Sequence, residues 1–191
     1  LVDDLENLRS HLRIDKAHLV GHSLGGQIVP RYARKFPDRV ITLSLLSTAA
    51  FRTGDEKQKI LDVIKEIRKL GIDEVLPRLI IRWFTDNFIA KNPDVISKRI
   101  DQVKTTDIET FLRVFWIYAT CTMEEWLSEI KAPALVMTGE NDTGCNPNIN
   151  KKIADSIQNS KLIILENLRH TITLEAPKIV GENIKLFLNN L

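Results

Sequence analysis

The chain has 191 residues, of which 43% are hydrophobic and 27% charged, with a formal net charge of +2. This composition is typical of one globular domain with a sizeable core, and so small a charge argues against a nucleic-acid-binding protein. No apolar run is long enough to span a membrane, and the two cysteines, Cys121 and Cys145, are too few for a disulfide scaffold, so we expect a cytoplasmic protein that binds neither nucleic acid nor membrane.

The first predicted elements alternate between helix and strand. Leucines at helical spacing predict a helix over residues 1–13, and because the chain opens inside it we expect upstream sequence to be missing. A strand over 17–21 and an amphipathic helix ending at Phe36 follow. The run 40–46 is almost continuously apolar, which is typical of a strand buried on both faces of a parallel sheet. These elements predict an α/β layered architecture for residues 1–50.

Residues 51–131 show helical periodicity without a convincing strand. A helical insert between two strands, on the side where strands end, is well placed to cover an active site as a lid. Its aromatic side chains either line a substrate pocket or form the core of the insert itself. The pocket candidates are Trp83, Phe84 and Trp116 of the insert, together with His22 next to Ser23.

Residues 132–191 again alternate between predicted strands and helices. Strands are predicted at 134–138 and 162–165, and helices at about 147–158 and 177–188. This segment therefore completes the layered core that residues 1–50 begin.

The run Gly21-His22-Ser23-Leu24-Gly25 lies between the predicted strand 17–21 and the helix after it. A serine in a sharp strand-to-helix turn, flanked by glycines, is the pattern of a nucleophile elbow, although an ordinary glycine-rich turn reads the same way. The backbone N–H of Leu24 is then the natural donor to the oxyanion of an acyl transfer.

A serine nucleophile needs a base and an acid that orients the base. His170 is the single histidine downstream of Ser23, in the loop after strand 162–165. Asp142, just beyond strand 134–138, is our choice for the acid, with Glu140 as the local rival. A surface histidine and a turn-forming carboxylate remain the alternatives.

Together these segments resemble the α/β-hydrolase superfamily. The resemblance is carried by Gly21-His22-Ser23-Leu24-Gly25-Gly26, Thr138-Gly139-Glu140-Asn141-Asp142 and Arg169-His170-Thr171-Ile172-Thr173-Leu174-Glu175-Ala176-Pro177. Within the superfamily, Arg82-Trp83-Phe84-Thr85 and Phe88 are similar to the lid of 3-oxoadipate enol-lactonases.

The resemblance implies an α/β-hydrolase fold with a partial, mostly parallel sheet flanked by helices and a helical lid between two strands. It implies Ser23 as nucleophile, Asp142 as acid and His170 as base. The serine at the elbow argues against the epoxide hydrolase and haloalkane dehalogenase branches, which place an aspartate there. Nothing before Ala17 matches the first strands of the family, so we expect the second oxyanion donor to lie in a missing N-terminal portion.

The resulting hypothesis is a serine hydrolase that cleaves a carboxylic ester or lactone of a small molecule through an acyl-enzyme. It requires no metal and no organic cofactor. The alternatives are a ligand-binding or sensing protein on a hydrolase scaffold, and an inactive fragment of a hydrolase.

Overall fold

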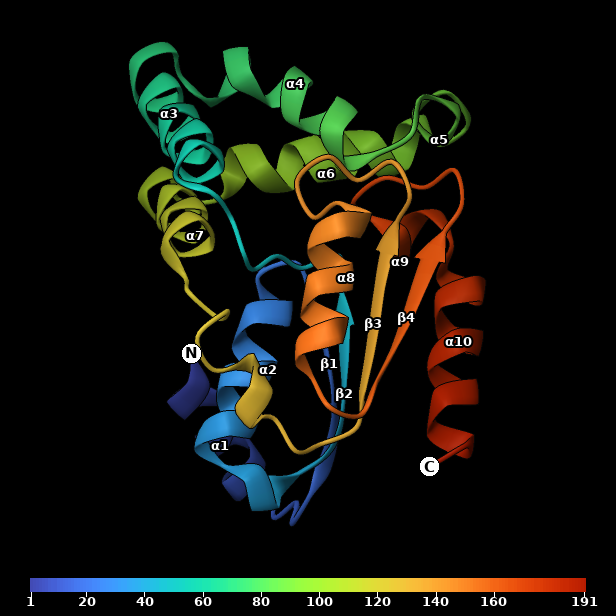
Figure 1. Cartoon of the computed structure of the whole chain (residues 1–191). Coiled ribbons are helices and arrows are strands. Elements are labelled where there is room, and N and C mark those ends of the chain that lie inside the picture. The colour runs from blue at the N-terminus through green and yellow to red at the C-terminus, as the bar shows by residue number, and fades with distance from the viewer. The chain divides into compact units, whose positions relative to one another are not determined.

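Four parallel strands form a sheet in the order β1-β2-β3-β4 (Figure 1). A computed structural model describes residues 1–191, and its strands are β1 (Ala17–His22), β2 (Val40–Leu46), β3 (Ala134–Gly139) and β4 (Ser160–Leu165). The two central strands are buried almost throughout, whereas β1 and β4 are edge strands with exposed positions. The four strands lie where the sequence predicts them, to within two residues at each end.

The register brings the carboxyl ends of all four strands to one edge of the sheet. His22 pairs with Leu46, Leu46 with Met137, and Gly139 with Leu165. The loops that leave these strand ends are therefore neighbours, although the sequence separates them widely. In open parallel sheets this edge is where ligands bind.

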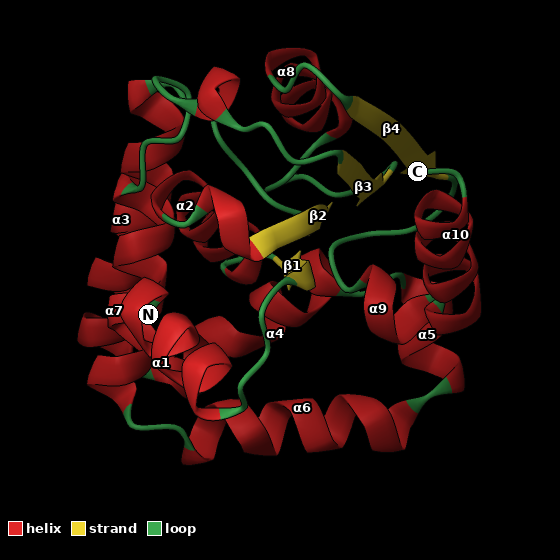
Figure 2. Ribbon diagram, turned by 90° about the horizontal axis from the view of Figure 1, so that it is seen from below, coloured by secondary structure: helices red, strands yellow, loops and turns green.

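Helices cover both faces of the sheet (Figure 2). Helices α2 and α8 pack on one face and α10 on the other. On the α10 side, Leu135 and Met137 of β3 meet Val180 in a buried cluster. The helices of this unit, which comprises Leu1–Phe51 and Thr122–Leu191, are α1 (Val2–His11), α2 (Gly25–Lys35), α8 (Pro147–Ser156), α9 (Ile172–Glu175) and α10 (Pro177–Asn189), with short 3-10 turns η1 (Pro37–Arg39) and η2 (Leu127–Glu129).

Residues Arg52–Cys121 form a second compact unit made only of helices. Capping side chains define several helix starts: Thr53 and Glu56 form a capping box, and Asp107 accepts a hydrogen bond from the Thr110 N–H. Buried aliphatic side chains and Phe84 fill the core of this unit. The helices are α3 (Gly54–Leu70), α4 (Ile72–Trp83), α5 (Asp86–Lys91), α6 (Pro93–Thr105) and α7 (Ile108–Thr120). None of the helices in either unit is both long enough and apolar enough to cross a bilayer.

Residues 122–131, which the sequence analysis includes in the insert, pack with the sheet-containing unit. Trp126 is buried there, with the guanidinium groups of Arg31 and Arg34 over its ring at 5.6 and 5.2 Å from the centroid. Residues 122–131 contain no strand, so periodicity in the sequence does not assign them to the sheet-containing unit. The contacts of Trp126 with Arg31 and Arg34 do.

Candidate active site

Ser23 occupies a strained turn between β1 and α2. Its φ angle is +55°, in the left-handed region that non-glycine residues rarely adopt. The Ser23 N–H donates to the Leu46 carbonyl at 2.8 Å, so the turn is bonded to the end of the neighbouring strand. A Cβ at Gly21 would lie 2.3 Å from the Gly25 carbonyl oxygen, which explains why this turn needs glycine at that position. The geometry is that of a nucleophile elbow.

Helix α2 starts two residues after Ser23. The Ser23 carbonyl accepts a hydrogen bond from the Gly26 N–H at 3.0 Å, which closes the turn. The Leu24 N–H is not taken up by the backbone hydrogen bonds of the turn. Because N–H groups and the helix dipole both favour negative charge at a helix start, this donor suits an oxyanion formed next to Ser23.

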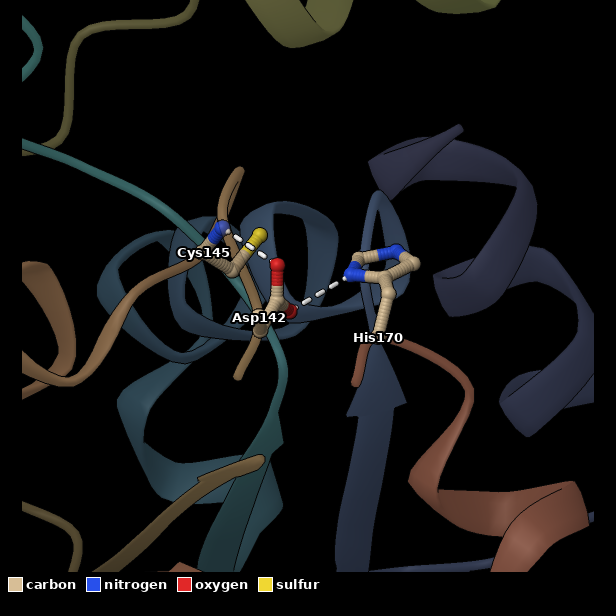
Figure 3. A group of neighbouring side chains, drawn as sticks. All are labelled: Asp142, Cys145 and His170. Carbon is tan, nitrogen blue, oxygen red and sulfur yellow. Dashed lines mark hydrogen bonds and ion pairs between the residues drawn. The ribbon is translucent and has the colours of Figure 1, made fainter. Parts of the chain in front are cut away.

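Asp142 is held by its own loop after β3. One carboxylate oxygen, Oδ1, accepts hydrogen bonds from the Gly144 and Cys145 N–H groups, both at 2.9 Å. The other, Oδ2, lies 2.8 Å from Nδ1 of His170 (Figure 3). The residue is only 3% exposed. Its rival Glu140 instead accepts a hydrogen bond from the Asn167 N–H at 3.0 Å, away from the imidazole.

His170 links the acid to the serine. Its Nε2 lies 3.0 Å from the Ser23 Oγ, while its Nδ1 faces Asp142. A carboxylate can only accept a hydrogen bond, so Nδ1 carries a proton, and in the neutral imidazole Nε2 is the atom that can accept a proton from Ser23. The three residues that the sequence selects from separate segments thus form one connected chain of contacts, the arrangement that a proton relay requires.

The charges of Asp142 and His170 stabilise each other. Burial by itself raises the pKa of the Asp142 carboxyl, but the hydrogen bond and charge of His170 and two backbone N–H groups lower it, and the net direction is downward. Burial lowers the pKa of His170, but the Asp142 carboxylate and the Cys145 side chain both raise it, and the net direction is upward. The Asp142 carboxylate is therefore charged at neutral pH and makes the imidazole a stronger base.

His22, predicted as a pocket residue, contacts the loop that carries His170. Its Nε2 lies 2.9 Å from the His170 carbonyl oxygen, and the two rings are 5.1 Å apart between centroids. Since a carbonyl oxygen accepts, the His22 ring donates this bond and fixes the backbone that carries His170. Sequence reasoning missed this role, although the position of His22 next to Ser23 was a signal that it lies at the site.

The aromatic pocket candidates from the insert all belong to the helical unit. Phe84 is fully buried in the core of that unit, stacked on Phe88 with the ring centroids 5.5 Å apart. Trp83 is partly buried against the same core, and the Arg99 guanidinium lies 5.2 Å from its ring centroid. Trp116 is 57% exposed. Phe84 therefore packs in the core of the helical unit, whereas Trp116 is mostly exposed.

Cys145 joins Asp142 and His170 in a group whose potential metal-ligand atoms all lie within 4.8 Å of one another (Figure 3). Cysteine, histidine and aspartate are the ligands that zinc prefers. However, both Asp142 oxygens already accept hydrogen bonds, and the bond to His170 would have to break for an ion to enter. The hydrogen bonds of Asp142 therefore explain why these side chains lie together, and no metal ion is needed to explain it.

Comparison with known proteins agrees with the fold. The family model described as serine aminopeptidase, S33, matches residues 1–177. The (E)-2-((N-methylformamido)methylene)succinate hydrolase of Acinetobacter baylyi is 26% identical over 181 residues, covering 93% of this chain and 66% of that protein. The 3-oxoadipate enol-lactonase 2 of the same organism is 27% identical over 182 residues, covering 95% and 67%. The chain thus spans about two thirds of the length of these two relatives.

Among solved structures, the enol-lactonase from Burkholderia xenovorans superposes with a TM-score of 0.89 at 23% identity. The superposition covers 99% of this chain and 72% of that protein. At this level of identity the likeness concerns the fold.

Proposed function

Because the chain belongs to the family of serine aminopeptidase S33 within the α/β-hydrolase superfamily, we propose that it is a serine hydrolase of small carboxylic esters or lactones. The observation that carries the proposal is the continuous relay from Ser23 Oγ through His170 to Asp142, with contacts of 3.0 and 2.8 Å. One relative is named a hydrolase and another an enol-lactonase, which supports an ester or lactone substrate.

In the proposed reaction, Ser23 Oγ attacks the substrate carbonyl while His170 Nε2 takes the hydroxyl proton. The carbonyl oxygen becomes an oxyanion, and the Leu24 N–H donates a hydrogen bond to it. When the tetrahedral intermediate collapses, the C–O bond to the leaving group breaks and His170 returns its proton to the departing oxygen. Opening a lactone leaves that oxygen on the acyl group.

Water then cleaves the acyl-enzyme by the same route. His170 Nε2 removes a proton from the attacking water, and after collapse the proton returns to the Ser23 oxygen. Throughout both steps the Asp142 carboxylate holds the proton on Nδ1 and stabilises the imidazolium. The buried position of Asp142 strengthens this interaction, because water does not screen it.

Labelling with a fluorophosphonate probe tests the nucleophile. We expect the protein to react at Ser23 and the Ser23→Ala variant not to react. Ser10→Ala, which changes an exposed serine on α1, is the matched control and retains the label. Labelling that persists after Ser23→Ala would exclude this serine as the nucleophile.

Steady-state hydrolysis distinguishes the proposed enzyme from a binding or sensing protein. We expect repeated turnover of a short p-nitrophenyl ester and of a simple lactone, both lost in Ser23→Ala. An aminoacyl p-nitroanilide serves as the amide substrate, since the family description refers to an aminopeptidase. Turnover of the anilide in preference to the ester would move the substrate class from esters to amides. Labelling without turnover of any of them would favour a binding protein.

A further inference from the structure

Asn150 connects two of the loops that carry the candidate catalytic groups. Its side chain, on α8, is fully buried. The Nδ2 group donates to the Cys145 carbonyl at 2.7 Å and to the Thr48 carbonyl at 3.1 Å. Cys145 lies in the loop after β3 and Thr48 in the loop after β2, so one amide is bonded to the loops that follow two neighbouring strands.

On one side the connection continues to the nucleophile. The Thr48 hydroxyl donates to the Ser23 carbonyl at 2.9 Å. That carbonyl also receives the hydrogen bond from Gly26 that closes the strained turn. Thr48 therefore connects the two: its hydroxyl binds the Ser23 backbone, and its carbonyl accepts the hydrogen bond from Asn150.

On the other side the connection continues to the acid. Cys145 donates its backbone N–H to Asp142 Oδ1, and its carbonyl accepts from Asn150 and from the Thr138 hydroxyl at 2.8 Å. The peptide groups on both sides of Cys145 are therefore held in place. Asp142 Oδ2 in turn contacts His170, and His170 contacts Ser23.

We propose that Asn150 is a positioning residue that sets the distance between the nucleophile turn and the acid loop. The proposal rests on the hydrolase mechanism above. The hydrogen bonds run in a closed ring from Ser23 through Thr48, Asn150, Cys145, Asp142 and His170 back to Ser23. A ring of this kind transmits a displacement of either loop to the contact between Ser23 and His170.

The position requires a donor rather than any polar side chain. Nδ2 faces three carbonyl oxygens, those of Thr48, Cys145 and, at 3.2 Å, Asn146 of its own helix. The Oδ1 atom is buried and accepts no hydrogen bond. Flipping the amide would place Oδ1 against three acceptors, so the orientation with Nδ2 toward the loops is the one that satisfies the carbonyls.

The test compares Asn150→Ala with Asn146→Ala. Asn146 caps α8 by accepting from the Ile149 N–H, so its loss weakens the same helix without removing a bond to either loop. We expect Asn150→Ala to lower kcat by about 10²-fold, as misplacement of reacting groups by about 1 Å does, with little change in KM. Asn146→Ala keeps kcat near that of the unmodified protein.

A double-mutant cycle separates positioning from general destabilisation. In an Asp142→Asn background we expect the additional loss of kcat from Asn150→Ala to be much smaller than in the unmodified background, because the acid it positions is already inactive. Thr48→Val, which removes the hydroxyl donor to Ser23 and keeps the side-chain shape, tests the same ring if Asn150→Ala fails to fold. It is expected to lower kcat with KM unchanged.

The low-field proton NMR signal of His170 Nδ1–H gives a readout that does not depend on turnover. We expect Asn150→Ala, or Thr48→Val, to shift or broaden this signal and Asn146→Ala to leave it intact. An unchanged signal in both of the first two variants would overturn the positioning role, as would equal kcat losses in Asn150→Ala and Asn146→Ala. If the unmodified protein shows no turnover but the signal changes as expected, the proposed reaction fails while the positioning role stands.

Discussion

Gly139, at the end of β3, lies so close to the loop before His170 that a Cβ there would be 2.3 Å from the Arg169 carbonyl oxygen. The Leu168 carbonyl oxygen would be 2.5 Å away. Both contacts are with backbone, which cannot move aside as the end of a flexible side chain can. The approach of the base-carrying loop to the end of β3 therefore depends on glycine at this position.

Gly139→Ala is expected to destabilise the protein by about 3 kcal/mol, at the upper end of the usual cost of overpacking, and to lower the rate of ester hydrolysis. The added methyl group pushes the loop 168–169 outward and moves His170 away from Ser23. Urea unfolding measures the first effect and steady-state kinetics the second. Gly181→Ala is the control, because beyond its chain neighbours and the backbone of its own helix no atom lies within 4 Å of its Cβ position on α10.

We expect this control to stabilise the protein by about 0.5–1 kcal/mol, the usual gain from alanine inside a helix, and to leave hydrolysis unchanged. If Gly139→Ala behaves like Gly181→Ala, the close approach does not determine the position of the His170 loop.

Ser23→Gly is expected to be more stable than Ser23→Ala, although neither can form an acyl-enzyme. The φ angle of +55° costs an L-residue about 1–2 kcal/mol, which glycine avoids, while the greater freedom of glycine in the unfolded chain offsets part of the gain. The net difference should be about 1 kcal/mol in the free energy of unfolding, measured in urea. Equal stabilities would mean that the backbone strain at Ser23 is no larger than the entropic cost of glycine in the unfolded chain.

Asp142→Asn is expected to lower kcat by about 10⁴-fold, the loss seen when an amide replaces the acid of such a relay. Hydrolysis needs neutral His170, so the rate rises with pH through the pKa of this residue. The carboxylate raises that pKa, and its removal moves the rising limb of the kcat/KM profile to lower pH.

Glu140→Gln is the matched control, because the Gln side chain can still accept the hydrogen bond from the Asn167 N–H. Glu140→Gln should keep the rate of hydrolysis and the pH at which the rising limb of the kcat/KM profile lies. If the rising limb of the kcat/KM profile lies at the same pH in Asp142→Asn as in the unmodified protein, the carboxylate does not set the pKa of His170.

The stability difference between the unmodified protein and Asp142→Asn should depend on pH. Asp142 has a lowered pKa when folded, so its contribution is present above the usual value of 3.8 and is lost as pH falls through the folded pKa. His170 has a raised pKa, so its contribution is present below 6.5 and is lost as pH rises through the folded value. The difference in unfolding free energy should therefore be largest between pH 3.8 and 6.5. A difference that is constant with pH would mean that the pair is not coupled.

Local patterns in the sequence were enough to predict the strands and most helices. The almost continuous apolar run at Val40–Leu46 is a buried central strand, and the glycine-flanked Ser23 lies in a turn with positive φ, as expected. The insert is helical, as its periodicity predicts. Each of these features depends on residues a few positions apart, so a single sequence contains the information.

Periodicity could not distinguish between residues whose surroundings come from distant segments. Phe84 and Trp116 are both aromatic residues of the helical insert, yet one is fully buried and the other mostly exposed. Asp142 and Glu140 are two residues apart, and only the backbone N–H groups of Gly144 and Cys145 and the position of His170 distinguish them.

The sequence by itself determined the order of strands and helices, the serine turn, and the short set of acids and bases that could serve it. Only the tertiary structure decided which carboxylate meets His170, and that His22, Thr48 and Asn150 bind the backbone of the surrounding loops. The reason is physical. Strands and turns arise from neighbouring residues, whereas these hydrogen bonds join residues 25 or more positions apart, and only the register of the sheet brings them within reach.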